Sequence, residues 1–227
     1  MKRTLMTIAL CLLTASAWAQ QSWSTNLTLN TVIPDNNPSG VAGTFAVGGL
    51  IDTISNVTVT LNITGGFNGD LYMYLVGPNG GFAVLLNRTG LSTVNAFGYA
   101  NPGFNITLSD GAANGNIHYY QNVLNPGGAP LTGTWSPDGR NIDPQSAGSA
   151  FDAAAVTATL GSFIGNNANG TWGFFLADLS PGSQSTLVSV GLNILTVPEP
   201  QANALLALTA LFGLWRLRHR SQRQTPH

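Results

Sequence analysis

Alternation between apolar and polar residues predicts β-strands through the middle of the chain. From Val57 to Thr64, apolar residues at odd positions alternate with Thr and Asn at even positions. This period of two is typical of a strand with one buried and one solvated face. After two glycine-containing breaks, Leu71 to Val76 predicts a second strand, which a Gly-Pro-Asn-Gly turn closes. We expect residues 54–80 to form one antiparallel unit on which the rest of the chain packs.

The same pattern predicts several more strands on both sides of this unit. They cover residues 23–33, 41–47, 82–86, 106–108, 170–179 and 186–195. We expect the last two to pair as a hairpin, because a short Ser-Pro-Gly-Ser turn separates them. About eight short strands with many glycine turns predict an all-β fold, an antiparallel β-sandwich of jelly-roll type.

Three stretches depart from the strand pattern. Residues 33–38 contain two prolines and an Asp-Asn-Asn cluster, which exclude regular structure there. Residues 89–149 are rich in Gly, Asn and Pro and predict long surface loops, where ligand sites are usual. Residues 153–155 favour one helical turn.

The N-terminus predicts a signal peptide over residues 1–19. Lys2 and Arg3 precede an apolar run, and Ala17 and Ala19 stand at the spacing that signal peptidase accepts. We expect cleavage after Ala19, which makes the mature protein exported. A buried N-terminal helix is the alternative.

The C-terminus carries a second apolar run, Ala202 to Trp215. As a helix it spans about 21 Å, which is short of the roughly 30 Å of a hydrocarbon layer. Basic residues follow it and predict a cytoplasmic end, so the body would lie outside the inner membrane. The membrane-sorting residues are Trp215, Arg216, Arg218 and Arg220. An amphipathic core helix is the alternative.

Immediately upstream stand Val197, Pro198, Glu199 and Pro200. This motif, followed by a short apolar helix and an arginine cluster, resembles the PEP-CTERM sorting signal of bacterial exported proteins. The resemblance implies transient insertion in the inner membrane, processing by an exosortase, and an association with exopolysaccharide at the cell envelope, the outer surface or the extracellular matrix. The chain then divides into a signal peptide (1–19), one β-sandwich domain (20–196) and a sorting signal (197–227).

The predicted domain is poor in charge and acidic. It contains eight aspartates and two arginines, Arg88 and Arg140, so its net charge is −6. Because no basic patch is available to neutralise phosphates, we expect no binding to nucleic acid. The single cysteine, Cys11, lies in the signal peptide, so the domain has no disulfide.

Three pieces of the domain resemble, in the same order, the P domain (Homo B) of proprotein convertases. They are residues 33–36, residues 54–80 with Gly69-Asp70-Leu71, and residues 163–178 with Gly170-Thr171-Trp172 and Ala177-Asp178. The resemblance implies a jelly-roll sandwich that stands beside a subtilisin-like serine protease and, in some members, holds structural Ca²⁺. A subtilisin unit needs its own α/β core, for which the domain has no room.

Aspartate side chains supply the candidate calcium ligands, because Ca²⁺ prefers oxygen atoms. Asp70 and Asp178 stand at strand ends, where capping of backbone N–H groups is the alternative role. Asp138, Asn141 and Asp143 offer several oxygens within six residues, and a turn held by Asx hydrogen bonds explains them equally well.

Three functions are open from the sequence. The first is a non-catalytic surface or matrix module that binds polysaccharide or a surface protein. The second is an accessory domain for a separate subtilisin-like protease. The third, least favoured, is a hydrolase that uses His118, which we expect to be an exposed loop residue. The tyrosines at positions 72, 74, 99, 119 and 120 offer stacking surfaces for sugars, although packing is the commoner role of such residues.

Overall fold

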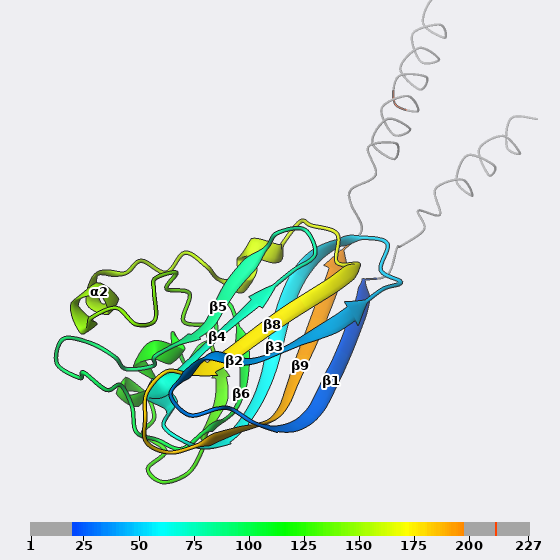
Figure 1. The fold of residues 1–227 in the computed structure, drawn as a ribbon. Helices are drawn as coiled ribbons and strands as arrows, with labels where there is room; N and C mark the ends of the chain where they lie inside the picture. The colour runs from blue at the N-terminus through cyan, green and yellow to red at the C-terminus, as the bar shows by residue number, and fades with distance from the viewer. Residues whose placement is uncertain (1–19, 198–211, 213–227) are drawn as a thin grey trace, which may run out of the picture. The chain divides into compact units, whose positions relative to one another are not determined.

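Two β-sheets lie face to face in the residues that the computed structural model describes, 20–197 and 212 (Figure 1). The five-stranded sheet has the order β1 (Gln21–Val32), β9 (Ser185–Val197), β3 (Thr53–Gly65), β6 (Phe104–Ser109) and β7 (Leu131–Trp135). The four-stranded sheet has the order β2 (Asn37–Val47), β8 (Gly170–Asp178), β4 (Leu71–Val76) and β5 (Phe82–Asn87). Neighbouring strands are antiparallel except for β6 and β7, which are parallel. The predicted all-β sandwich is therefore confirmed.

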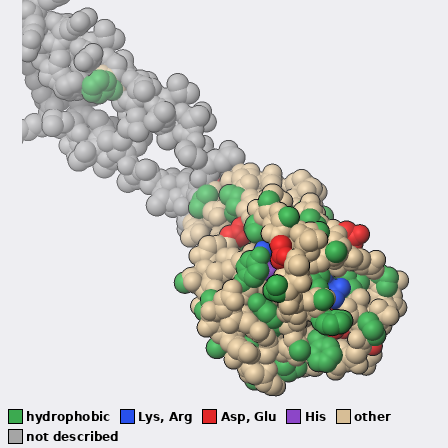
Figure 2. Space-filling model, turned by 90° about the vertical axis from the view of Figure 1, so that its left-hand side faces the viewer, with side chains coloured by type: hydrophobic (Ala, Val, Ile, Leu, Met, Phe, Trp, Pro, Cys, Tyr) green, Lys and Arg blue, Asp and Glu red, His purple; other side chains and the backbone are tan. Residues whose placement is uncertain are grey.

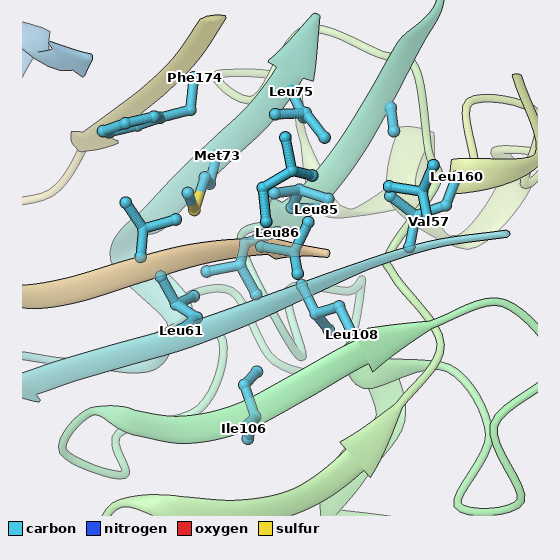
Figure 3. Close-up of a cluster of buried hydrophobic side chains, with 14 of the residues drawn as sticks. Val57, Leu61, Met73, Leu75, Leu85, Leu86, Ile106, Leu108, Leu160 and Phe174 are labelled. Carbon is cyan, nitrogen blue, oxygen red and sulfur yellow. The ribbon is translucent and has the colours of Figure 1, made fainter. Parts of the chain in front are cut away.

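The core fills the space between the two sheets (Figure 3). The odd-numbered apolar residues of β3, from Val57 to Ile63, are buried and face the core. Met73 and Leu75 on β4 meet them from the four-stranded sheet. Burying such side chains stabilises the fold by about 1.5–3 kcal/mol each, so the alternation along the strands fixes which face turns inward.

The connections carry the chain back and forth between the sheets. Successive strands switch sheet at every step except from β4 to β5 and from β6 to β7. This contradicts two of the pairings that we expected. β3 and β4 lie in different sheets, and so do β8 and β9.

Both wrong pairings have one physical reason. The apolar face of a strand turns toward the core whether the next strand hydrogen-bonds alongside it or lies in the opposite sheet about 10 Å away, so the alternation does not distinguish the two arrangements. The short helix η1 (Asn68–Asp70) takes the chain across after β3, and residues 179–184 do so after β8. The hairpin that does form joins β4 and β5.

The Asp-Asn-Asn-Pro stretch is more regular than we expected. Strand β2 begins at Asn37 and includes Pro38. The strand lies at the edge of its sheet and its register with β8 shifts between Asn37 and Val41. An edge strand with an irregular register tolerates a residue that has no N–H to donate.

The long region between β5 and β8 contains more structure than its composition indicates. It includes β7, the helix η2 (Ile117–Asn122), the helix α2 (Gly148–Ala153) and the helix η3 (Leu160–Phe163). The expected helical turn at 153–155 is therefore displaced toward the N-terminus. Trp135 and Tyr120 are fully buried, so these segments add to the core. Figure 1 places α2 and long loops on the left-hand side of the sandwich, which we call the loop end.

The predicted signal peptide and most of the sorting signal lie outside the described residues. Ala17 and Ala19 lie before the first described residue. Of the residues after Val197, which include Trp215 and the arginines, the structure describes Phe212 alone. Val197 is described and is the last residue of β9. No helix among the described residues is long and apolar enough to cross a membrane.

Candidate functional site

Two of the predicted candidate residues, Asp70 and Asp178, come together at the loop end. β4 and β8 are neighbours, and Leu71 stands opposite Asp178 in their register. The amide N–H of Leu179 donates to the carbonyl oxygen of Asp70 at 2.9 Å. Both aspartates are buried. Residues 108 positions apart thus form one acidic site, which we call the acidic pair.

Arg88 lies against this pair, at the end of β5. Its Nη2 atom is 3.8 Å from Oδ1 of Asp70. The hydrogen bonds of Arg88 go to neutral groups instead. Its Nε atom donates to the carbonyl oxygen of Gly69 at 2.5 Å, and its Nη2 atom donates to the hydroxyl of Ser180 at 2.7 Å. Arg88 therefore neutralises the acidic pair only in part.

The carboxylates outnumber the cations in this site. Asp35, which we did not single out from the sequence, raises the pKa of both Asp70 and Asp178 through its charge. Burial is the largest influence, and together with Asp178 it raises the pKa of Asp70 to about 6. Burial likewise raises the pKa of Asp178. The Oδ2 atom of Asp178 is buried without a hydrogen-bond partner among the described residues.

The second group of predicted calcium ligands does not converge. Asp138 is buried, whereas Asn141 and Asp143 are exposed. The Oδ1 atom of Asp143 accepts a hydrogen bond from the amide of Gln145 at 2.9 Å, which is an Asx turn. Among the described residues, no group of three or more His, Cys, Asp or Glu side chains is placed to hold a metal ion. Calcium at Asp70 and Asp178 stays a prediction.

Asp138 instead joins His118 and Arg140 in a buried network. Its Oδ2 atom is 2.7 Å from Nδ1 of His118, and its Oδ1 atom is 3.0 Å from Nη1 of Arg140. The Nε2 atom of His118 faces the carbonyl oxygen of Leu91 at 3.0 Å. His118 is only 1% exposed, so the prediction of an exposed loop histidine was wrong. The network joins the loop after β5 to η2 and to the segment that follows β7.

The five tyrosines divide among three environments. Tyr72 and Tyr74 are half-buried on the outer face of β4, where the ring of Tyr74 stacks on Phe175 with centroids 5.2 Å apart. Tyr120 lies in the core and contacts the ring of Tyr99 edge-on. The guanidinium of Arg140 lies over the ring of Tyr119, 4.8 Å from its centroid. Most of these rings pack against other residues.

The outer face of the five-stranded sheet carries small uncharged side chains in register across the strands. We call it the polar face, and its rows are Ser24, Asn193, Thr58 and Ser109; Asn26, Gly191, Thr60, Thr107 and Thr134; and Thr28, Ser189, Asn62, Asn105 and Thr132. A groove of about 390 Å³ lies on this face. None of the described residues that line it is charged or aromatic. The alternation along the sequence indicated the polar side of β1, β3 and β9, whereas Thr132 and Thr134 belong to β7, which the sequence did not predict. Only the register places all these residues in rows.

Comparison with solved structures finds chains that are similar to this one. No protein-family model and no curated protein sequence matches the chain. The chain is similar to the serine protease of Aeromonas sobria in complex with its chaperone, with a TM-score of 0.43 and 15% identity over 85% of this chain and 30% of that chain. For the serine protease without the chaperone, the TM-score is 0.43 and the identity 14%, over 84% of this chain and 29% of that one. This chain spans less than a third of their length.

Proposed function

We propose that this chain is an exported, non-catalytic β-sandwich module that binds another exported protein through its loop end. The observation that carries the proposal is a group of exposed apolar side chains on this end. Val94 is 96% exposed and Phe97 is 81% exposed, and both belong to the loop that follows β5. Val123 and Leu124 after η2 are exposed as well. Large apolar side chains that gather on a surface mark interaction sites.

The loop that presents these side chains is firmly held. The side-chain amide of Asn101 donates to Oδ1 of Asn125 at 3.1 Å and to the carbonyl oxygen of Gly127 at 2.7 Å. The amide of Tyr99 donates to the carbonyl oxygen of Thr89 at 2.9 Å. A preordered surface loses little conformational entropy when a partner binds. Figure 2, which views the loop end, shows hydrophobic side chains among uncharged ones, with few charges between them.

A separate subtilisin-like protease is the partner that we propose, which makes the chain an accessory module. The support is the P-domain resemblance, because its Gly69-Asp70-Leu71 piece, where η1 leads into β4, lies beside its Ala177-Asp178 piece at the end of β8. A photo-crosslinking amino acid at position 94 tests the idea in the native host, with position 44 on the outer face of β2 as the exposed control. We expect position 94 alone to cross-link to a secreted protease. Equal cross-linking at both positions would contradict the proposal.

Binding of a neutral polysaccharide is a second candidate, and the polar face favours it. Rows of hydroxyl and amide groups can hydrogen-bond to successive sugars, and the net charge of −6 disfavours an acidic polymer. Retention on the exopolysaccharide of the native host is the measurement. Thr60→Glu in the groove should abolish retention, whereas Thr44→Glu on the other sheet should not. Retention that survives Thr60→Glu would remove this candidate.

A further inference from the structure

A pocket opens beside the acidic pair and within the proposed docking surface. Its volume is about 250 Å³. Its lining includes Phe67, Asp70, Phe97, Tyr99, Ser180 and Pro181. Aromatic and proline side chains therefore form most of its wall, and a single carboxylate lies in it. Figure 2 shows the loop end of the molecule, which carries the loops around this pocket.

The wall of the pocket is rigid. The amide of Gly69 donates to the carbonyl oxygen of Tyr99 at 2.8 Å. A Cβ atom at Gly69 would lie 2.5 Å from the carbonyl oxygen of Phe97, so the loop rests directly on the backbone of η1. The hydroxyl of Thr89 donates to the carbonyl oxygen of Asn68 at 3.0 Å and fixes the other side of that turn. The pocket is preformed and does not depend on a partner to shape it.

The electrostatics of the pocket favour a cation. The charges of Asp178 and Asp35 raise the pKa of Asp70, which lines the pocket, and the charge of Arg88 opposes them. The 3.8 Å separation between Arg88 and Asp70 is longer than a hydrogen bond, and the buried Oδ2 atom of Asp178 has no partner among the described residues. A positive charge in the pocket would lie beside the carboxylate of Asp70 and would stabilise its ionised form.

The shape of the pocket selects among cations. Aromatic rings attract ammonium and guanidinium groups through their faces, and apolar walls cover the methylene stems of Lys and Arg. We propose that the pocket binds a lysine or arginine side chain of the partner protein, with its charged group beside Asp70 and its stem against Phe97. This proposal rests on the proposed protein-binding function and names the chemistry that the partner presents.

A peptide titration of the purified mature protein tests the proposal. The probe is acetyl-Ala-Arg-Ala-amide, and the matched control is the same peptide with citrulline, which has the same shape without the charge. The amide NMR signals of Gly98 and Tyr99 report binding. We expect the arginine peptide to bind at least fivefold more tightly than the citrulline peptide at pH 7.5, and more weakly at pH 5, where Asp70 is protonated. Equal affinity for the two peptides would overturn the proposal.

Two variants locate the contact. Asp70→Asn should lower the affinity for the arginine peptide about tenfold, because it removes the negative charge of the pocket. Phe97→Ala should lower this affinity about threefold, because it removes an exposed aromatic ring. Asp143→Asn, which removes an exposed carboxylate elsewhere, should change nothing. Unchanged affinity in Asp70→Asn would refute the site. Binding of Ca²⁺ that is lost in Asp70→Asn and that excludes the peptide would show that the pocket is a metal site instead.

The outcome separates this proposal from the proposed function. If position 94 cross-links to a protease but the peptides bind equally, the docking function stands and the basic-side-chain pocket fails. If the arginine peptide binds selectively while position 94 cross-links to no partner, the pocket stands and the docking function fails.

Discussion

Within residues 20–197, the buried charged side chains are concentrated in two clusters at the loop end. In one, Asp138 connects His118 and Arg140 with nearly complete exclusion of solvent. Removing one member of such a cluster leaves the remaining charges buried without a partner. The free-energy cost of these unpaired charges exceeds the net stabilisation that the intact cluster provides. The cluster therefore specifies how three loop segments meet, whether or not it adds much stability of its own.

Asp138→Ala should lower the free energy of unfolding by about 3–5 kcal/mol, because the side chains of His118 and Arg140 lose their carboxylate. Urea denaturation measures this quantity directly. The control is Asp143→Ala in the exposed Asx turn, which should cost no more than about 1 kcal/mol. A similar loss in both variants would show that the buried network contributes nothing special.

Asp70 gives the protein a pH-dependent stability. Its pKa rises from 3.8 to about 6 on folding, so the folded state binds more protons than the unfolded state between these values. The free energy of unfolding should therefore fall as the pH rises from 4 to 6.5, by on the order of 1–3 kcal/mol, and level off above that range. Asp178, whose pKa is also raised, contributes with the same sign. Thermal melting from pH 4 to 8 measures the effect.

In Asp70→Asn the slope between pH 4 and 6.5 should become shallower, while Asp143→Asn should keep the slope of the unmodified protein. A free energy of unfolding that increases across this range in the unmodified protein would refute the assignment of the raised pKa to Asp70.

The sequence indicated that Asp70 and Asp178 were candidate site residues, but it could not show that they lie next to each other. Their proximity comes from the pairing of β4 with β8, which no local pattern encodes.

At the scale of elements, the sequence predicts strands well and their partners poorly. Every predicted strand exists, because alternation is a local consequence of having one buried face. β7 was missed, because a five-residue strand with an exposed Thr-Gly-Thr centre has too little alternation to recognise. The helix η2 was missed as well. The sheet that each strand joins depends on contacts between segments far apart in the chain, as the separation of β8 from β9 shows.

A glycine at the junction of two elements offers a test of this packing. Gly103, just before β6, has a φ of +87°, and a Cβ atom there would lie 2.2 Å from the carbonyl oxygen of Ile63 on β3. Gly103→Ala should cost roughly 2–4 kcal/mol, from the left-handed backbone and from the overlap. Gly111→Ala is the matched control, since its φ is +70° with no atom near, and it should cost only about 1 kcal/mol. If denaturation shows the same decrease in the free energy of unfolding for both variants, the backbone between β3 and β6 accommodates the added methyl group.

At the scale of the whole molecule, the two ends of the sandwich domain lie together, because Gln21 on β1 stands opposite Thr196 on β9. Cleavage after Ala19 and near Pro198 would therefore leave every strand intact. We predict that the mature protein in its native host begins at Gln20 and lacks the segment from Trp215 to Arg223. Intact-mass spectrometry measures both termini, and the melting temperature should match that of a recombinant 20–200 fragment. A mature mass that retains the arginine cluster would contradict the sorting interpretation. It would also add the four positive charges of the arginine cluster to a domain whose net charge is −6.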